Sequence, residues 1–350
     1  MFYDGTKLLS MTDLNGDKPE IYICTSNRSA GKTTWFNRYA VKKFVKEKIK
    51  FMLIYRFNYE LDSVADKFFK EIKTLFYPSY NMVSYRRAKG IYHELFIGVE
   101  GQEEYEYVSC GYAVSLNSAD QLKKYSHLFA DTGIMIFDEF QSETNHYCAN
   151  EVSKFISLHT TVARGNGEQS KYLPVFMISN PVTIVNPYYV SLRISARLRT
   201  DTKFLRGEGF VLEQGFNETA SLAQKGSAFN RAFKDNKYVA YAAESSYLND
   251  STAFVENMKG NSRYLATLKY ENKEYALREF ASQGIIYCDD KADLSFPLKI
   301  VTTTADHGIN YIMLKRNDMF IATLRYYFEN GLVRFKNIQC KEACLSALAY

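Results

Sequence analysis

A short apolar run that leads into a small polar loop and then into a helix constrains the fold of this chain more than any other feature. Residues 20–25 (EIYICT) predict a buried strand. Beyond the loop, apolar side chains recur at helical spacing, with Phe36, Ala40 and Phe44 on one face. Further strands at 50–56, 133–137 and 173–179 alternate with helical segments at 61–76 and 150–161. This alternation predicts an α/β domain with a parallel sheet.

The loop itself has the spacing of a Walker A motif, G-x-x-x-x-G-K-[ST], with Ser26 at the first glycine position. Such a loop directs backbone N–H groups at phosphates, and the helix that follows adds its N-terminal dipole. Lys32 is expected to reach the β- and γ-phosphates of ATP, and Thr33 to hold Mg²⁺. The missing glycine leaves the loop geometry open, because only glycine adopts positive φ freely. The residues expected to bind the nucleotide are Ser26, Asn27, Arg28, Ser29, Ala30, Gly31, Lys32, Thr33 and Thr34.

The apolar run 133–137 ends in Asp138 and Glu139, which is the Walker B pattern. An aspartate at a strand end can hold Mg²⁺, and the glutamate beside it can polarise the attacking water. We therefore expect ATP and Mg²⁺ as ligands, with Thr33 and Asp138 on the metal and Glu139 in catalysis. The adjacent glutamate favours a P-loop ATPase of the additional-strand, catalytic-glutamate type. The sequence has no N-K-x-D motif for reading guanine.

Two further polar residues follow predicted elements. Asn180 comes directly after the strand 173–179 and is interpreted either as a sensor of the γ-phosphate or as the cap of a turn before Pro181. Arg164 follows the helix 150–161, where an arginine can neutralise transition-state charge in a neighbouring subunit. From the residues alone, a surface arginine is the favoured interpretation of Arg164.

The pattern changes twice along the chain. Residues 1–205 are predicted to form the P-loop ATPase domain, with small antiparallel strands at 81–116 inserted into its sheet. Residues 206–240 are rich in Gly, Ser, Asn and Gln and are interpreted as a linker with a short helix around 219–233. Residues 241–350 predict a smaller α+β domain of several strands followed by two helices.

The net charge of +5 arises before residue 241, because basic and acidic residues are equal in number after it. Two basic clusters are candidates for a nucleic-acid phosphate track, although charged stripes are more often solvated faces. The chain shows neither a signal peptide nor a run long enough to span a membrane. The six cysteines lack the paired spacing of a disulfide or zinc framework and are expected to be buried thiols. The basic clusters are Arg38, Lys42 and Lys46, and Arg193, Arg197, Arg199, Lys203 and Arg206.

Taken together, these motifs resemble the DNA-packaging (encapsidation) ATPases of φ29-type small tailed bacteriophages. The resemblance covers nearly the whole chain. The segments that carry it are the loop with its internal arginine, Arg28, and 51–61 (FMLIYRFNYEL), 136–140 (IFDEF), 161–164 (TVAR), 179–189 (SNPVTIVNPYY), 250–257 (DSTAFVEN), 284–290 (GIIYCDD) and 327–335 (YFENGLVRF).

The resemblance implies a homo-oligomeric ring, a pentamer, that docks transiently on the portal (connector) of an empty capsid in the host cytoplasm. It would pump double-stranded DNA inward, and some relatives use a structural packaging RNA. The resemblance makes Arg164 a trans-acting arginine finger and makes Lys124, or its neighbour Lys123, a residue acting between subunits. It also implies an RNase H-like C-terminal domain without nuclease activity. The residues agree, because the strand 263–270 (RYLATLKY) has no carboxylate, and Asp289 and Asp290 are expected to be isolated surface acids.

Two other classes remain open at this point. One is a different P-loop enzyme, such as a helicase-like or transport ATPase, which would share the site but bind another track. The other is a non-catalytic assembly protein with a vestigial ATP site, against which the presence of Lys32, Thr33, Asp138 and Glu139 together argues.

Overall fold

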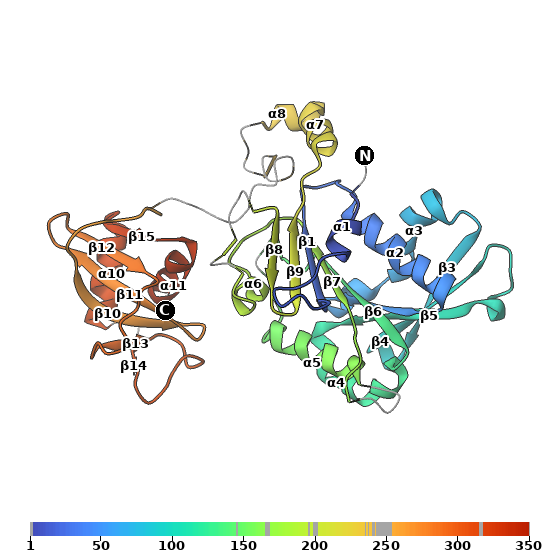
Figure 1. The fold of residues 1–350 in the computed structure, drawn as a ribbon, viewed down its shortest axis with the longest axis horizontal. Helices are drawn as coiled ribbons and strands as arrows, with labels where there is room; N and C mark the ends of the chain where they lie inside the picture. Colours follow the sequence, from blue (N-terminus) through green and yellow to red (C-terminus); the bar gives the residue numbers. More distant parts are fainter. Residues whose placement is uncertain are drawn as a thin grey trace. The chain divides into compact units, whose positions relative to one another are not determined.

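The computed structural model describes residues 3–144, 146–164, 169–194, 197–198, 202–234, 236, 238–239, 242, 254–314 and 318–349. The chain divides into two compact units, Met1–Asn249 and Asp250–Tyr350. Each unit is built on its own β-sheet (Figure 1). The predicted arrangement of a large parallel-rich α/β domain followed by a smaller sheet domain is confirmed.

The sheet of the first unit has nine strands within the described residues. Strands β5, β2, β6, β7, β1 and β9 run parallel to their neighbours in this order, and antiparallel strands flank them. In spatial order the strands are β3 (Tyr80–Arg87), β4 (Tyr92–Val99), β5 (Val108–Ser115), β2 (Lys50–Tyr55), β6 (Thr132–Asp138), β7 (Val175–Ser179), β1 (Ile21–Thr25), β9 (Phe210–Gln214) and β8 (Phe204–Gly207).

Helices cover both faces of this sheet, with α2 and α3 on one side and α4 and α5 on the other (Figure 1). The central strands are therefore apolar at consecutive positions: in β6, Met135 and Phe137 join the core under α5, while Ile134 and Ile136 join the core under α2 and α3. Burial on both faces is what a parallel sheet requires. The helices of this unit are α1 (Thr6–Leu9), α2 (Lys32–Glu47), α3 (Val64–Phe76), α4 (Ala119–Leu122), α5 (Glu151–Ala163), α6 (Pro187–Ser191), α7 (Glu218–Gly226) and α8 (Ala228–Ala232).

The antiparallel strands predicted at 81–116 lie at one edge of the sheet rather than inside it. Strand β3 pairs with β4 and β4 with β5, and β5 then continues the parallel order beside β2.

The expected linker 206–240 is wrong over its first part, because a β-hairpin occupies it. Strand β9 pairs in parallel with β1 and antiparallel with β8, which makes this hairpin part of the main sheet. The larger unit extends to Asn249. The glycines that suggested a linker shape the turn instead: Gly209 has φ +73°, and a Cβ on Gly207 would lie 2.0 Å from the ring of Phe210. The predicted short helix corresponds to α7 and α8.

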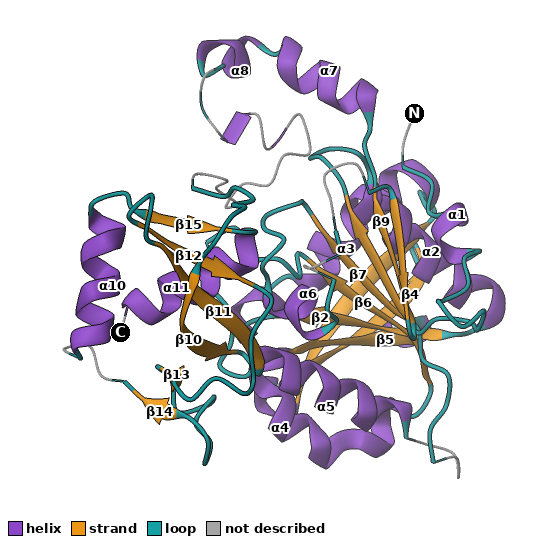
Figure 2. Cartoon of the chain, turned by 60° about the vertical axis from the view of Figure 1, so that its left-hand side comes forward, coloured by secondary structure: helices purple, strands orange, loops and turns teal. Residues whose placement is uncertain are grey.

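In the second unit, β10, β11 and β12 form an antiparallel meander, and β13 and β14 continue in parallel beside β10. Helices α10 (Met319–Glu329) and α11 (Ile338–Ala349) contribute to a single core against this sheet (Figure 2). In spatial order the strands are β14 (Ile312–Met313), β13 (Lys299–Val301), β10 (Arg263–Tyr270), β11 (Lys273–Phe280), β12 (Ile285–Asp289) and β15 (Val333–Phe335).

Asp289 and Asp290 are not the isolated surface acids expected from the sequence. Asp289 is 8% exposed and pairs with Arg278 at 2.7 Å, and Asp290 forms an ion pair with Lys336. Each acid comes at the end of β12, where a basic side chain from a neighbouring segment meets it, which a single strand cannot reveal.

The six cysteines are free and buried, as predicted. Within the part of the chain that the structure describes, no helix is both long and apolar enough to cross a membrane.

Candidate nucleotide site

The loop between β1 and α2, the candidate phosphate-binding loop, contains two residues with left-handed backbone. Ser29 and Gly31 have φ of +60° and +91°, and Gly31 directly precedes the first residue of α2. Ser26 is not among the residues with positive φ, so a serine at the first glycine position does not strain the backbone there. The doubt that the missing glycine raised about the loop geometry is thereby removed.

Lys32 begins α2 and turns back over the loop. Its Nζ donates to Asn180 Oδ1 at 2.7 Å and to the carbonyl of Ser26 at 3.4 Å. The side chain is 7% exposed, and this burial lowers the pKa of its ammonium group. Asn180, predicted as a sensor or a turn cap, thus lies next to the P-loop lysine.

The Walker B carboxylate lies beside the P-loop. The Thr33 hydroxyl donates to Asp138 Oδ1 at 3.4 Å. Burial and then the neighbouring Glu139 charge raise the pKa of the Asp138 carboxyl to about 6. A divalent cation between this hydroxyl and this carboxylate would favour the ionised form, so the residues present suit Mg²⁺.

Glu139 follows in the left-handed region, with φ +54°. Two contacts stabilise this turn: its N–H donates to Asp138 Oδ1 at 3.0 Å, and its carbonyl accepts from the Arg56 guanidinium at 3.4 Å. The Glu139 side chain is exposed and lines a cavity of about 250 Å³.

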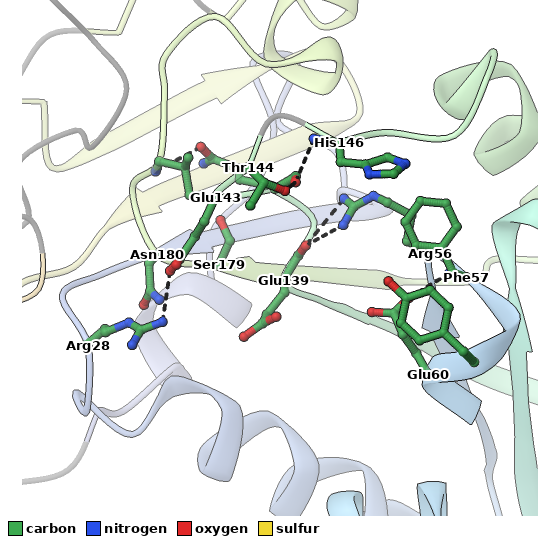
Figure 3. A pocket seen from close by; sticks show the side chains of 14 residues that line it. Arg28, Arg56, Phe57, Glu60, Glu139, Glu143, Thr144, His146, Ser179 and Asn180 are labelled. Carbon is green, nitrogen blue, oxygen red and sulfur yellow. Dashed lines mark hydrogen bonds and ion pairs between the residues drawn. The ribbon is translucent and has the colours of Figure 1, made fainter. Parts of the chain in front are cut away.

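Figure 3 shows Glu139 in the middle of this cavity, with Arg28 and Asn180 on one side and Arg56 and Phe57 on the other. The lining residues come from the carboxyl ends of β2, β6 and β7 and from the P-loop. They are Arg28, Arg56, Phe57, Tyr59, Glu60, Glu139, Gln141, Ser142, Glu143, Thr144, His146, Ser179, Asn180 and Val182.

Arg56 lines this cavity and holds neighbouring segments of it together. It was not identified as a site residue from the sequence. Its guanidinium binds both carboxylate oxygens of Glu151 at 2.9 and 3.1 Å and donates to the carbonyl of Phe140 at 2.7 Å. Tyr188 donates to the same carboxylate at 2.9 Å. A signal was present, because a charged residue at the carboxyl end of a buried parallel strand lies at the edge where ligands bind.

Arg28 lies on the other side of the cavity. Its Nη2 forms an ion pair with Glu143 at 2.9 Å, and its guanidinium lies 5.4 Å from the ring centre of Tyr238. The positive charge of Arg28 is therefore partly neutralised within its own subunit.

Other loop residues make contacts away from the expected phosphate position. The Thr34 hydroxyl donates to Glu71 of α3 at 2.7 Å. The Asn27 side chain exchanges two hydrogen bonds with the backbone of Asn217, and Ser29 Oγ accepts from Gln224 at 3.2 Å. Ala30 is buried, with 1% exposure.

The two residues expected to act between subunits do not line the cavity. Arg164 is exposed and follows the last residue of α5. Lys124 is exposed in a 3₁₀ segment, Lys123–Phe129, whereas its neighbour Lys123 is engaged by Asp120 at 3.0 Å.

Comparison with known proteins places these features in a family context. The family model for the podovirus DNA encapsidation protein (Gp16) matches residues 1–348. The DNA packaging protein of Bacillus phage phi29 is 24% identical over 342 residues, which is 96% of this chain and 94% of that protein. The corresponding protein of Bacillus phage PZA is also 24% identical over 342 residues, with the same coverage.

Solved structures agree on the fold. A chain of the bacteriophage Phi-29 viral genome packaging motor assembly superimposes with a TM-score of 0.68 at 22% identity, covering 100% of this chain and 97% of that one. A chain of the Phi-28 gp11 DNA packaging motor gives 0.61 at 16% identity, covering 99% and 97%. Both likenesses extend over the two units.

Proposed function

This chain belongs to the podovirus DNA encapsidation protein (Gp16) family, and we propose that its P-loop site hydrolyses ATP through Glu139. It is a DNA packaging ATPase of the phi29-like phages and part of a viral genome packaging motor. The observation that carries the residue-level proposal is the meeting of Lys32, Asp138 and Asn180 at the carboxyl edge of one sheet, beside the cavity that Glu139 lines.

The P-loop residues would hold the phosphates of ATP. The backbone of residues 26–31 would offer N–H groups at the start of α2, where the helix dipole favours anions, although the Arg28 N–H donates to the carbonyl of Ala242 at 3.2 Å. Lys32 would exchange its bond to Asn180 for a bond to a phosphate oxygen. The buried ammonium group would then contact an anionic acceptor in place of a neutral amide. Asn180 would then be released to report on the bound phosphate.

Thr33 and Asp138 would hold Mg²⁺. When bound, this ion would neutralise charge on the phosphate oxygens. Asp138 provides the anionic ligand and Thr33 the neutral one, and their contact at 3.4 Å holds them on the same side of the loop.

Glu139 would act as the general base on the attacking water. Its left-handed backbone, held by Arg56, directs the side chain into the cavity while Asp138 stays at the strand end. Arg56 is a positioning residue in this scheme, since it contacts the Glu139 carbonyl.

The strand order supports an ATPase of the additional-strand, catalytic-glutamate type. Strand β7 pairs with both β1 and β6, so it separates the P-loop strand from the Walker B strand. In the second unit, the meander β10–β12 followed by parallel β13 and β14 supports the RNase H-like class that the resemblance implies.

The partners follow from the family. We infer that this chain assembles into a homopentameric ring on the portal of an empty capsid in the host cytoplasm and moves double-stranded DNA. A packaging RNA that joins the ring to the portal is a further candidate partner. The name of the phi29 assembly, a viral genome packaging motor, supports a multi-subunit machine of this kind.

The test of this function is ATP turnover with and without double-stranded DNA. We expect turnover that DNA stimulates and that Lys32→Ala abolishes. Stimulation by single-stranded nucleic acid alone would favour a helicase-like ATPase. Absence of turnover in correctly assembled rings would favour an assembly protein with a vestigial site.

Two basic surfaces are candidates for the DNA track. The Arg38 guanidinium lies 4.0 Å from the ring centre of Phe76, beside a groove of about 380 Å³ that Lys42 and Lys46 also line. In the other cluster, Arg193 has φ +56°, Arg197 donates to the carbonyl of Arg206 at 2.6 Å, and Arg199 lies outside the described residues.

Neutralising Arg193, Arg197 and Arg199 together is expected to flatten the slope of log K against log salt by up to about three units, one for each DNA phosphate that these arginines would neutralise. The measurement is DNA binding over a salt series with several sequences, because phosphate contacts do not depend on sequence. Neutralising Arg38, Lys42 and Lys46 is the matched comparison. If only that second variant flattens the slope, the α2–α3 groove is the DNA track.

A further inference from the structure

Two buried hydrogen-bond donors line the catalytic cavity, and the mechanism above does not use them. Gln141 and Ser179 are each 2% exposed. Gln141 Nε2 and Ser179 Oγ have no hydrogen-bond partner among the described residues. Both residues line the cavity that Glu139 lines, and Ser179 directly precedes Asn180. A buried polar group without a partner is unfavourable, and an acceptor on a ligand in this cavity would satisfy these two donors.

The orientation of the Gln141 amide is determined by its other end. Its Oε1 accepts from the backbone N–H groups of Val182 at 3.1 Å and Thr183 at 3.0 Å. Because both of these partners are donors, the oxygen must face them, and the NH₂ group is left for the cavity. Gln141 can therefore only donate to a ligand, and the ligand must present an acceptor.

We propose that Gln141 Nε2 and Ser179 Oγ donate to the terminal phosphoryl oxygens of bound ATP and so distinguish ATP from ADP. This inference rests on the proposed ATP site. A phosphoryl oxygen is an acceptor without hydrogens, which suits two donors on residues that line one cavity. The pair lies on the same edge as Asn180, so its ligand is the end of the nucleotide nearest Glu139.

Gln141 also connects this contact to the chain beyond β7. The amide holds the backbone of Val182 and Thr183, and the carbonyl of Thr183 accepts from Asn186 Nδ2 at 3.0 Å. Asn186 is fully buried and caps α6, after which the chain reaches Arg193. A phosphoryl group that accepts a hydrogen bond from Gln141 would therefore be linked, through this side chain, to the backbone of residues 182–183. That segment continues to Arg193, in one of the two candidate DNA tracks.

The test compares the affinities of two nucleotides. Gln141→Glu keeps an acceptor for the two backbone N–H groups but replaces the donor with a carboxylate oxygen. We expect its affinity for a non-hydrolysable ATP analogue to fall about 10- to 100-fold, as when a hydrogen bond to a charged group is removed, while ADP affinity stays near normal. Ser179→Ala should weaken analogue binding in the same selective way, with less disturbance of the fold.

Thr132→Ala is the matched control. Thr132 is also fully buried, with its hydroxyl unpartnered among the described residues, but it begins β6 instead of ending it. Its replacement is expected to leave both affinities unchanged. Equal losses of affinity in the two site variants and in this control would mean that buried hydroxyl and amide groups act only on stability.

Amide hydrogen exchange provides a readout that is independent of turnover. In the wild type, the analogue should protect the N–H groups of residues 182–183 more than ADP does, and Gln141→Glu should remove this difference. If wild-type turnover is normal but Gln141→Glu and Ser179→Ala bind the analogue normally, the inference is wrong and the proposed function stands. If the wild type binds neither nucleotide, the proposed function fails first.

Discussion

Alanine in place of Arg164 is expected to lower DNA-stimulated ATP turnover by about 10³- to 10⁵-fold, the effect of removing an arginine finger, while ATP binding stays normal. The geometry of α5 motivates this expectation. The helix begins at Glu151, whose carboxylate binds Arg56 beside the cavity, and it ends one residue before Arg164. At 1.5 Å per residue, thirteen helical residues extend about 20 Å. Arg164 is thus far from its own cavity, which favours action on a neighbouring subunit.

The decisive experiment mixes Arg164→Ala with Lys32→Ala, which has an inactive pocket but an intact Arg164. If the arginine acts in trans, mixed rings regain turnover at interfaces that join an intact pocket to an intact arginine. Lys154→Ala, on the same helix, is the control and should retain turnover. Mixed rings that form but stay inactive would point to a cis cation instead, for which Arg28 is the candidate despite its ion pair with Glu143.

Glu139→Gln is expected to bind ATP normally and to lower turnover by roughly 10²-fold or more, the scale on which general-base catalysis contributes. The amide keeps the size of the side chain and leaves the backbone contacts of Glu139 with Asp138 and Arg56 in place. Nucleotide affinity and single-turnover hydrolysis should be measured together.

Asp138→Ala is the matched comparison for this variant. It should weaken Mg²⁺-dependent binding of ATP, since it removes the anionic ligand of the ion. Its main effect should therefore be on nucleotide affinity, whereas the main effect of Glu139→Gln should be on the rate of hydrolysis. Near-normal turnover in Glu139→Gln would refute the assignment of the base, and a Glu139→Gln variant that fails to bind ATP would move this residue into the binding set.

Much of the local structure of the candidate site could be predicted because its elements are local in sequence. The run 20–25, the loop 26–31 and the start of α2 are contiguous, and each has a pattern that a short window contains: a run of apolar residues, small polar residues and helical spacing. The same holds for Asp138 and Glu139, which follow an apolar strand. Parallel strands bring such carboxyl-end residues to one edge, so their meeting could be expected as well.

The contacts that complete the site could not be predicted in this way. Arg56 reaches Glu139, Gln141 holds Val182 and Thr183, and Asn27 binds Asn217. Each of these contacts joins segments that are distant in the sequence and depends on a side-chain rotamer. The partner of a buried polar group is chosen by geometry, and no periodicity in either segment records it.

In the segment 204–214, the local sequence preference and the tertiary contacts of the chain can be told apart. Its glycines and short strands are compatible with a linker or with a hairpin, since Gly207 and Gly209 suit either. What decided between them is the free edge of β1, which offers unpaired backbone groups that β9 satisfies. The sequence by itself determined the local strand, loop and helix of the candidate phosphate site, because backbone preference and hydrophobic period act over a few residues. The tertiary structure decided which distant groups complete the sheet and the cavity, because hydrogen-bond satisfaction and burial are settled only when the whole chain packs.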